Sequence, residues 1–312
     1  METFDKSTDQ EPTFHYAAQV RRKSGNAFFE DEEVQVEHTL DVYIGSVLAM
    51  RIVCTPDHLV DLVVGRLFTE GIIKSADDVQ MVYMFEYATK ARVLLNRKVD
   101  LEKVNAPVVP SCCTGNKVFS AIEANGADMV PVRPIPWKPE WVFNLADCFA
   151  HDTPMHRRTY GAHSCFLAVG DQILYCCEDL GRHNAFDKVI GCALRAGTDL
   201  TQAIIYTSGR LPVDMVTKAI KAGVPILVSK AVPTDLTIEL ARRFDLTLVC
   251  AARPDSMKVY HDPAWEKLPE TGGEWKVPRL FDAEAEVASD AGGDEARAPV
   301  AQANPNSACE GN

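Results

Sequence analysis

The spacing of apolar side chains divides the chain into two halves. In the first half, apolar residues follow the short period of β-strands at 34–36, 42–54, 79–86 and 92–95. Between the second and third of these segments, apolar side chains recur every three or four residues from Asp57 until Gly71, which predicts a helix. We therefore expect residues 34–110 to form a small α+β domain.

In the second half, the expected strands and helices alternate. Strands connected through helices pair in parallel, so this order predicts a largely parallel sheet with helices against its faces. We assign residues 111–260 to this α/β domain. Its helices are predicted at 116–125, 139–152, 184–195, 213–222 and 235–244, and its strands at 164–169, 172–177, 203–206, 225–229 and 246–251.

The two ends of the chain are more polar than its middle. Residues 1–33 are expected to form an N-terminal arm. Residues 261–312 are expected to be an acidic, mostly disordered tail, because 283–312 hold almost no bulky apolar side chains that could build a core. Residues 281–312 carry seven acids and one base, which is half of the net charge of −12.

The remainder of the chain excludes several classes of partner. It is only mildly acidic and has no long Lys/Arg run, so electrostatic binding of nucleic acid is not expected. No apolar stretch approaches the ~18 residues of a membrane helix, and the first residues contain acids in place of a signal sequence. We expect a cytoplasmic protein with neither a nucleic-acid nor a membrane partner.

Polar residues follow three expected strands of the second half. Because the carboxyl ends of parallel strands meet at the edge where α/β proteins bind ligands, their cations and the following helix N-termini predict an anionic, nucleotide-like ligand. Asp255 could pair with the edge of a guanine. Any one of these turns, taken alone, is better interpreted as an ordinary loop with solvated cations; it is the presence of three at the same edge that favours a ligand. The residues are Ser208, Gly209, Arg210, Ser229, Lys230, Ala251, Ala252, Arg253, Pro254, Asp255 and Ser256.

The densest polar segment is Glu178–Lys188, which we call the polar block. It lies where an expected strand turns into a helix. Solvated capping would explain its first acids, but Arg182, His183 and Asn184 before an apolar helix face indicate a binding function. His163 precedes a strand of the same sheet and is predicted to face the same cleft, although a lone histidine is as often structural.

The ten cysteines have no zinc-like spacing, because the close pairs are adjacent in sequence. Cys112 and Cys113 come just before a predicted helix, where the positive end of the helix dipole favours a thiolate. Of Cys176 and Cys177, at most one is expected to face a cleft, because strand side chains alternate. Free cysteines usually pack as small hydrophobes. We expect this of Cys54, Cys148, Cys165, Cys192 and Cys250.

Together, these motifs resemble the formate dehydrogenase accessory sulfurtransferase family (FdhD). They occur in the family's order across roughly residues 34–260, and the polar block is the most specific of them. The matching segments are Gly65–Ile73, Ser111-Cys112, Thr159-x-Gly161-x-His163, Glu178–Lys188, Ser208-Gly209-Arg210 and Arg253–Tyr260.

The resemblance implies a cytidine-deaminase-like mixed α/β sheet with flanking helices, a smaller N-terminal α+β domain, and a homodimer. It implies that a cysteine desulfurase loads sulfur as a persulfide on Cys112, with Cys113 as the neighbouring catalytic thiol. The sulfur would pass to the molybdenum cofactor (bis-molybdopterin guanine dinucleotide) before that cofactor enters formate dehydrogenase. In this family, the loop matching Ala251–Ser256 contacts the cofactor, which is a bound substrate; no metal ligands of the protein's own are expected.

The sequence departs from the family pattern at two positions. The family usually has two cysteines separated by two residues, but here Gly115 stands where the second would be and Cys113 is the nearby spare thiol. Ser256 stands where the family often has arginine. The missing second cysteine keeps an alternative open, in which the protein is a non-catalytic chaperone that delivers the finished cofactor to a molybdenum or tungsten enzyme.

Overall fold

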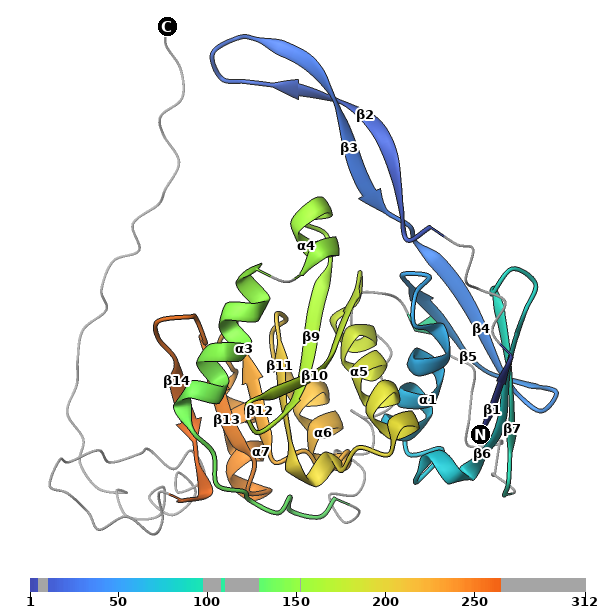
Figure 1. Ribbon diagram of the computed structural model, residues 1–312, viewed down its shortest axis with the longest axis vertical. Coiled ribbons are helices and arrows are strands. Elements are labelled where there is room, and N and C mark those ends of the chain that lie inside the picture. The colour runs from blue at the N-terminus through green and yellow to red at the C-terminus, as the bar shows by residue number, and fades with distance from the viewer. Residues whose placement is uncertain (5–10, 98–107, 110–128, 152, 265–312) are drawn as a thin grey trace, which may run out of the picture. The chain divides into compact units, whose positions relative to one another are not determined.

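The computed structural model describes residues 1–4, 11–97, 108–109, 129–151 and 153–264 (Figure 1). They belong to one compact unit, Met1–Glu266. The expected helix at 116–125, both thiols Cys112 and Cys113, and most of the acidic tail lie outside the described residues.

The first half forms a six-stranded sheet of order β1-β6-β7-β4-β5-β8. Its strands β4, β5, β6 and β7 overlap the segments that the apolar pattern predicts as strands, whereas their order comes from the structure. One face carries helix α1, whose apolar side chains pack on those of β4 and β6. The elements are β1 (Glu2–Phe4), β4 (His38–Ile44), β5 (Val47–Cys54), α1 (Leu59–Thr69), η1 (Ala76–Asp78), β6 (Val79–Phe85), β7 (Lys90–Leu95) and β8 (Val108–Val109).

The second half forms another six-stranded sheet, of order β10-β9-β11-β12-β13-β14. Of the five described strand pairs in this sheet, only β11–β12 and β12–β13 are parallel, so the expectation of a largely parallel sheet was wrong. The hairpin of β9 and β10 through Gly170-Asp171 agrees with the sequence, but β9 pairs antiparallel with β11 on one side and β14 pairs antiparallel with β13 on the other. The strands are β9 (His163–Val169), β10 (Gln172–Asp179), β11 (Ala203–Thr207), β12 (Ile226–Ser229), β13 (Thr247–Cys250) and β14 (Lys258–His261).

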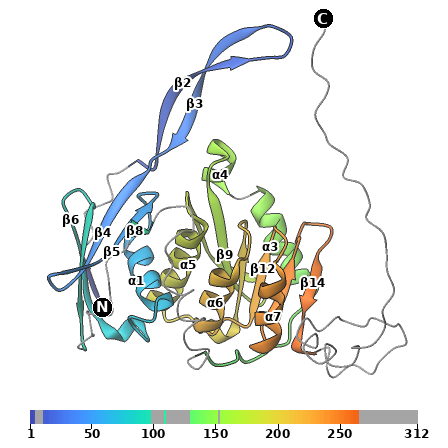
Figure 2. The same ribbon diagram turned by 180° about the vertical axis from the view of Figure 1, so that it is seen from behind.

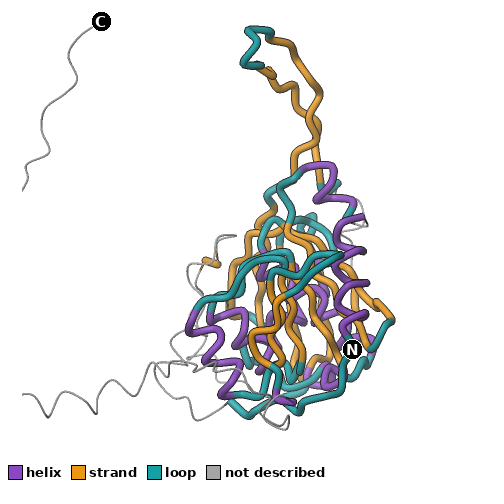
Figure 3. Tube along the Cα trace, turned by 90° about the vertical axis from the view of Figure 1, so that its left-hand side faces the viewer, coloured by secondary structure: helices purple, strands orange, loops and turns teal. Residues whose placement is uncertain are grey.

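Helices cover both faces of this second sheet, which confirms the predicted mixed α/β class. Helix α3 (Pro139–His151) packs on one face through Val142 and Leu145. Helices α5 (Arg182–Ala196), α6 (Val213–Lys221) and α7 (Asp235–Arg243) cover the other, and a short 3-10 helix η3 (Leu200–Gln202) precedes β11. Figure 2 shows α6 and α7 from behind, and Figure 3 shows helices on either side of the strands.

Helices α1 and α5 pack side by side and join the two sheets (Figure 1). The contact is backbone to backbone. A β-carbon on Gly65 would lie 1.8 Å from the carbonyl oxygen of Asp187, and one on Gly191 would lie 1.9 Å from that of Asp61. Only glycine allows this approach at both positions. The close contact fixes the start of α1 beside the middle of α5.

The N-terminal segment expected as a polar arm contains a hairpin of its own. Strands β2 (Thr13–Arg21) and β3 (Ala27–Gln35) pair along their whole length as a separate two-stranded sheet. Its base lies against the short helix α4 (Pro154–Thr159), where Arg158 and Glu33 form an ion pair of 3.3 Å. Within the part of the chain that the structure describes, no helix is long and apolar enough to cross a membrane.

Candidate functional site at the ends of the parallel strands

The three parallel strands end side by side, and backbone hydrogen bonds tie their following loops together. The Lys230 amide donates to Thr207 O at 3.1 Å, and the Ala252 amide donates to Ser229 O at 3.0 Å. The Ser229 hydroxyl donates to Gly209 O at 2.7 Å. The expected clustering of the segments after β11, β12 and β13 at one sheet edge is therefore present.

A pocket of about 420 Å³ opens at this edge, between the strand ends and helices α3 and α4. We call it the strand-end pocket. Its volume lies within the ~300–1,000 Å³ range of small-molecule sites. Four of its lining residues were expected from the sequence, namely Lys230, Ala252, Arg253 and Pro254. The lining is Ala146, Phe149, Ala150, Thr153, His156, Arg157, Tyr160, Tyr206, Lys230, Ala252, Arg253 and Pro254.

The pocket is cationic and has aromatic walls. Lys230 Nζ lies 4.6 Å from the centre of the Phe149 ring, and burial followed by the charge of Arg253 lowers the pKa of Lys230. Arg253 donates to the carbonyls of Lys230 and Ala252, so its contacts leave its charge uncompensated. Arg157 likewise donates to a backbone carbonyl, that of His151. Among the described residues that line the pocket, none is acidic. An anion with a flat ring system suits this arrangement.

His163 and Arg182 lie next to this edge. His163 Nδ1 is 3.2 Å from the Ser208 hydroxyl, which also accepts a hydrogen bond from the Ser164 amide. Burial and the nearby Arg182 charge lower the pKa of His163. A β-carbon on Gly209 would lie 2.8 Å from Arg182 Cδ, so this glycine makes room for the arginine stem. The structure thus brings together the predicted residues of β9, the β11 loop and the start of α5.

His183 and Asn184 point elsewhere. His183 is buried, with Nε2 3.3 Å from Asp214 of α6, and burial together with nearby cations such as Lys218 lowers its pKa to about 2. The Asn184 amide donates to Val53 O and to Asp179, at the contact with the first half of the chain. We expected both beside the ligand; instead both side chains are turned into the protein. The Asn184 amide finds its acceptors there, whereas His183 lies beside Asp214 with neither ring nitrogen hydrogen-bonded to a described residue.

The charged residues of the polar block bind other parts of the same chain. The Glu178 carboxylate accepts hydrogen bonds from the amides of Met155 and His156 at the start of α4. Lys188 donates to the carboxylates of Asp57 and Asp179. Burial alone lowers the pKa of Lys188, but these two carboxylates raise it above its ordinary value.

A second buried cluster surrounds Asp187. Its carboxylate lies 2.6 Å from Lys218 Nζ, 3.1 Å from Arg66 Nη1 and 2.8 Å from the Thr69 hydroxyl. Arg66 also pairs with Glu70 at 3.1 Å. These residues come from α1, α5 and α6, so the cluster joins both halves of the chain. Four ionisable side chains of the block, Glu178, Asp179, Asp187 and Lys188, thus have structural partners, which the sequence alone did not indicate.

The remaining predicted residues lie outside the pocket lining. Arg210, Asp255 and Ser256 are exposed, and the Ser256 carbonyl accepts a hydrogen bond from the Arg253 amide. Ala251 has a positive φ of 49°, which turns the chain from β13 into the loop. The two predicted catalytic thiols, Cys112 and Cys113, fall outside the described residues.

Sequence reasoning missed the α3 and α4 side of the pocket. Phe149, His156, Arg157 and Tyr160 line it, yet none was a candidate. The one signal was the basic run His156-Arg157-Arg158 just before the Thr159-x-Gly161-x-His163 motif. Its significance depends on α4 lying across the strand ends, which no local pattern predicts.

The core assignment of the cysteines is confirmed for Cys54, Cys165 and Cys250, which are buried. Cys176 is exposed while Cys177 is buried, as alternation along a strand requires. Cys148 and Cys192 are only partly buried, so they depart from the expectation of core packing.

Comparison with known proteins gives consistent relatives. A "Sulfur carrier protein FdhD" from Listeria innocua is 33% identical over 247 residues, covering 77% of this chain and 94% of its own length. One of the same name from Bacillus subtilis is 29% identical over 245 residues, covering 78% and 94%. A crystal structure of a putative formate dehydrogenase accessory protein from Desulfotalea psychrophila matches the fold with a TM-score of 0.67 at 24% identity, covering 81% of this chain and 98% of its own.

The family comparison covers the same part of the chain as the motifs. The model of the FdhD/NarQ family matches residues 35–265, which include the first sheet's strands from β4, the polar block and all the strand ends described above. The matched segment is well over half of the chain, and the resemblance expected from the sequence is thereby confirmed. The chain belongs to the FdhD/NarQ family.

Proposed function

We propose that this protein is a sulfurtransferase that accepts sulfur from a cysteine desulfurase as a persulfide on Cys112 and passes it to the molybdenum cofactor for formate dehydrogenase. Its curated relatives are named sulfur carrier proteins, and the solved structure with this fold is named a formate dehydrogenase accessory protein. A persulfide carrier needs one nucleophilic sulfur, and Cys112 stands at the family's cysteine motif.

The observation that carries the proposal is the strand-end pocket. Its described lining includes the cations Lys230, Arg253 and Arg157 and no acidic residue, which suits the diphosphate of a guanine dinucleotide. Its aromatic lining residues suit a flat heterocycle. The cofactor is therefore the proposed substrate, with the phosphates toward Lys230 and Arg253. His163 and Arg182, just beside the pocket, would contact the remainder of the ligand.

Sulfur loading tests the first step. Purified protein is incubated with a cysteine desulfurase and L-cysteine, alkylated, digested and analysed by mass spectrometry. We expect one added sulfur on the Cys112 peptide, none there in Cys112→Ala, and full loading in the control Cys176→Ser, which removes an exposed cysteine on β10. Cys113→Ala should still load, since a persulfide needs one thiol. Full sulfur gain by Cys112→Ala would contradict the assignment.

Complementation separates this function from the chaperone alternative, which the glycine at position 115 motivates. A strain lacking the protein is supplied with the Cys112→Ala, Cys113→Ala double variant, and formate dehydrogenase activity is measured. Sulfur transfer predicts loss of activity. Retained activity would favour a carrier that delivers the finished cofactor.

A further inference from the structure

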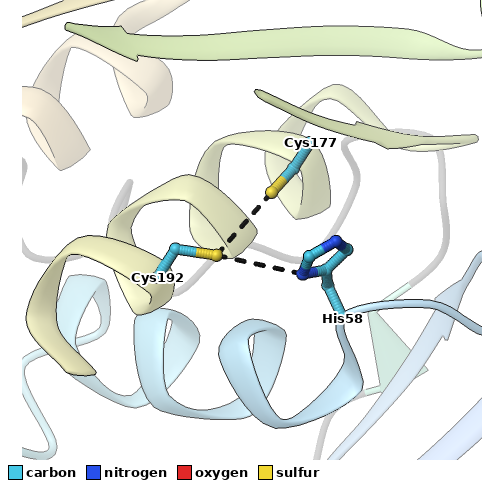
Figure 4. A group of neighbouring side chains, drawn as sticks. All are labelled: His58, Cys177 and Cys192. Atoms are coloured by element: carbon cyan, nitrogen blue, oxygen red, sulfur yellow. Dashed lines mark hydrogen bonds between the residues drawn. The ribbon is translucent and has the colours of Figure 1, made fainter. Parts of the chain in front are cut away.

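Outside the strand-end pocket, two thiols and an imidazole meet where α1 crosses α5 (Figure 4). Cys192 of α5 has its Sγ 3.9 Å from the Sγ of Cys177 on β10 and 3.9 Å from Nδ1 of His58, the residue before α1. The three atoms lie within 4.8 Å of one another. The Gly65 and Gly191 backbone contact sets the spacing between these helices, and Gly191 directly precedes Cys192.

The two thiols differ in access. Cys177 is 2% exposed, whereas Cys192 is partly exposed and His58 is exposed. A reagent from solvent therefore reaches Cys192 first, with Cys177 directly behind it. This is the arrangement of an attacking thiol with a second thiol within reach.

The charges around Cys192 favour its thiolate. A hydrogen bond from Cys177, followed by one from His58, lowers the pKa of Cys192 to about 6. The hydrogen bond to Asp61 and that to Cys192 raise the pKa of His58 to about 10, so its ring is a cation at neutral pH. Asp61 lies 3.1 Å from the same ring nitrogen and is itself paired with Arg195 at 2.6 Å. The hydrogen bond with Cys192, followed by burial, raises the pKa of Cys177, which stays a thiol.

The backbone of His58 has an unusual conformation that places its ring beside the thiols. His58 has a φ of 48°, in the left-handed region that costs energy for a residue with a side chain. This conformation holds a ring contacted by both Asp61 and Cys192 at the first turn of α1.

We propose that Cys192 is a second sulfur-accepting nucleophile, with Cys177 as its resolving thiol and His58 as the positioning residue that holds the thiolate. The substrate class is a sulfane-sulfur donor, meaning a persulfide or polysulfide. The inference rests on the proposed function only for the supply of such donors, since it concerns thiols distinct from Cys112.

Both steps balance without another reagent. The Cys192 thiolate attacks the terminal sulfur of a donor persulfide, the donor's S–S bond breaks, and the donor leaves as a thiolate while Cys192 gains a persulfide. Cys177 then loses its proton and attacks Cys192 Sγ. The sulfane sulfur leaves as hydrosulfide and takes up the Cys177 proton to give hydrogen sulfide, so it is reduced while the two cysteines are oxidised to a disulfide. The thiol sulfurs must approach by about 1.9 Å to reach the ~2.05 Å of an S–S bond.

The test uses the full chain carrying Cys112→Ser and Cys113→Ser, so that loading at Cys192 is independent of the family motif. Protein is incubated with sodium tetrasulfide, alkylated and mapped by mass spectrometry. We expect a Cys177–Cys192 disulfide with release of one equivalent of sulfide, and a stable Cys192 persulfide when Cys177→Ser is added. Cys176→Ser serves as the matched control and should behave as its parent.

His58→Asn tests the positioning role, because asparagine tolerates the left-handed backbone. We expect the pH midpoint of Cys192 alkylation to rise from about 6 toward the ~8.5 of an ordinary cysteine, and loading near pH 7 to slow by about tenfold. An unshifted midpoint, or no sulfur on Cys192 while Cys112 of the unmodified protein loads, would overturn the inference and leave the proposed function standing. Loading of sulfur at Cys192 without loading at Cys112 would overturn the proposed function and leave this inference standing. Zn²⁺ held by the two thiols and blocking their alkylation would overturn it in favour of a metal site.

Discussion

The polar block and the strand-end pocket contain the same kinds of charged side chain and differ in where the opposite charge comes from. In the block, Asp187 pairs with Lys218 and Arg66, and all three are buried. In the pocket, Lys230 and Arg253 contact an aromatic ring and backbone carbonyls, and no carboxylate among the described lining residues faces them. Charges balanced inside the chain join its parts, whereas the pocket cations without an ionic partner among the described residues are available to bind an anion.

Removing the central carboxylate of the block should give the largest effect. Asp187→Asn keeps the shape but removes the carboxylate paired with buried Lys218 and leaves buried Arg66 with Glu70 alone; breaking a buried ion pair typically costs about 3–5 kcal/mol. Urea unfolding followed by circular dichroism measures the loss. The control Asp255→Asn, at an exposed acid, should change stability by less than about 0.5 kcal/mol. Equal effects of the two variants would remove the distinction between the regions.

The cations of the pocket should show the opposite behaviour. Lys230→Ala or Arg253→Ala removes a charged donor to phosphate worth about 1.5–3 kcal/mol, so the Kd for guanosine diphosphate should rise by at least about tenfold. The unfolding midpoint should hardly change, because neither side chain has an ionic partner in the described chain. Calorimetric titration measures the affinity. The control Lys258→Ala removes an exposed cation of β14 outside the pocket and should leave the Kd unchanged.

The close backbone contact between α1 and α5 allows a comparison of two glycines. Gly191→Ala places a β-carbon 1.9 Å from the Asp61 carbonyl oxygen, so α1 and α5 must separate, at a cost of about 1–3 kcal/mol. Gly45→Ala is a poor control because its φ is positive, whereas Gly161→Ala meets only ordinary contacts. Thermal unfolding should distinguish Gly191→Ala from Gly161→Ala; equal midpoints would contradict the close packing.

Acidification should weaken the block through His183. Its folded pKa lies below its unfolded value of about 6.5, so the unfolded chain binds the proton first as the pH falls. The contribution of neutral His183 to the free energy of unfolding is complete above pH 6.5 and decreases toward about pH 2. About 1 kcal/mol of it is lost between pH 6.5 and 5.5. Urea unfolding across this interval should show a smaller decrease for His183→Gln. An unchanged slope would show that His183 does not stay neutral in the fold.

Much of the fold could be predicted from periodicity. The ranges expected for α1, α5 and α7 agree with the structure within a few residues, because each has an apolar face and a recognisable end. The antiparallel placement of β9 and β14 could not, since strand direction in a sheet depends on contacts far apart in sequence. The hairpin β2–β3 was not predicted, because its strands are mostly exposed and their sequence includes many charged and polar residues.

The candidate site shows the same limit. Lys230 and Arg253 were predictable because they follow strands that end at one edge. Asn184 and His183 were not separable from ligand-binding residues, because their partners Val53 and Asp214 are distant in the sequence. Cys192 was expected to pack in the core, because only the tertiary structure shows that His58, just before α1, lies beside its thiol. The type of a residue predicts which contacts its side chain can make. Whether it makes them with other residues of the chain or with a ligand depends on which distant residues the fold places beside it.

A crystal structure of this protein with guanosine diphosphate would show which of the two regions binds the nucleotide. We expect the diphosphate within hydrogen-bonding distance of Lys230 and Arg253, inside the strand-end pocket, with the ion pairs of Asp187 and Lys188 unchanged. Nucleotide bound instead to the polar block, with those ion pairs broken, would show that the strand-end pocket is not the ligand site.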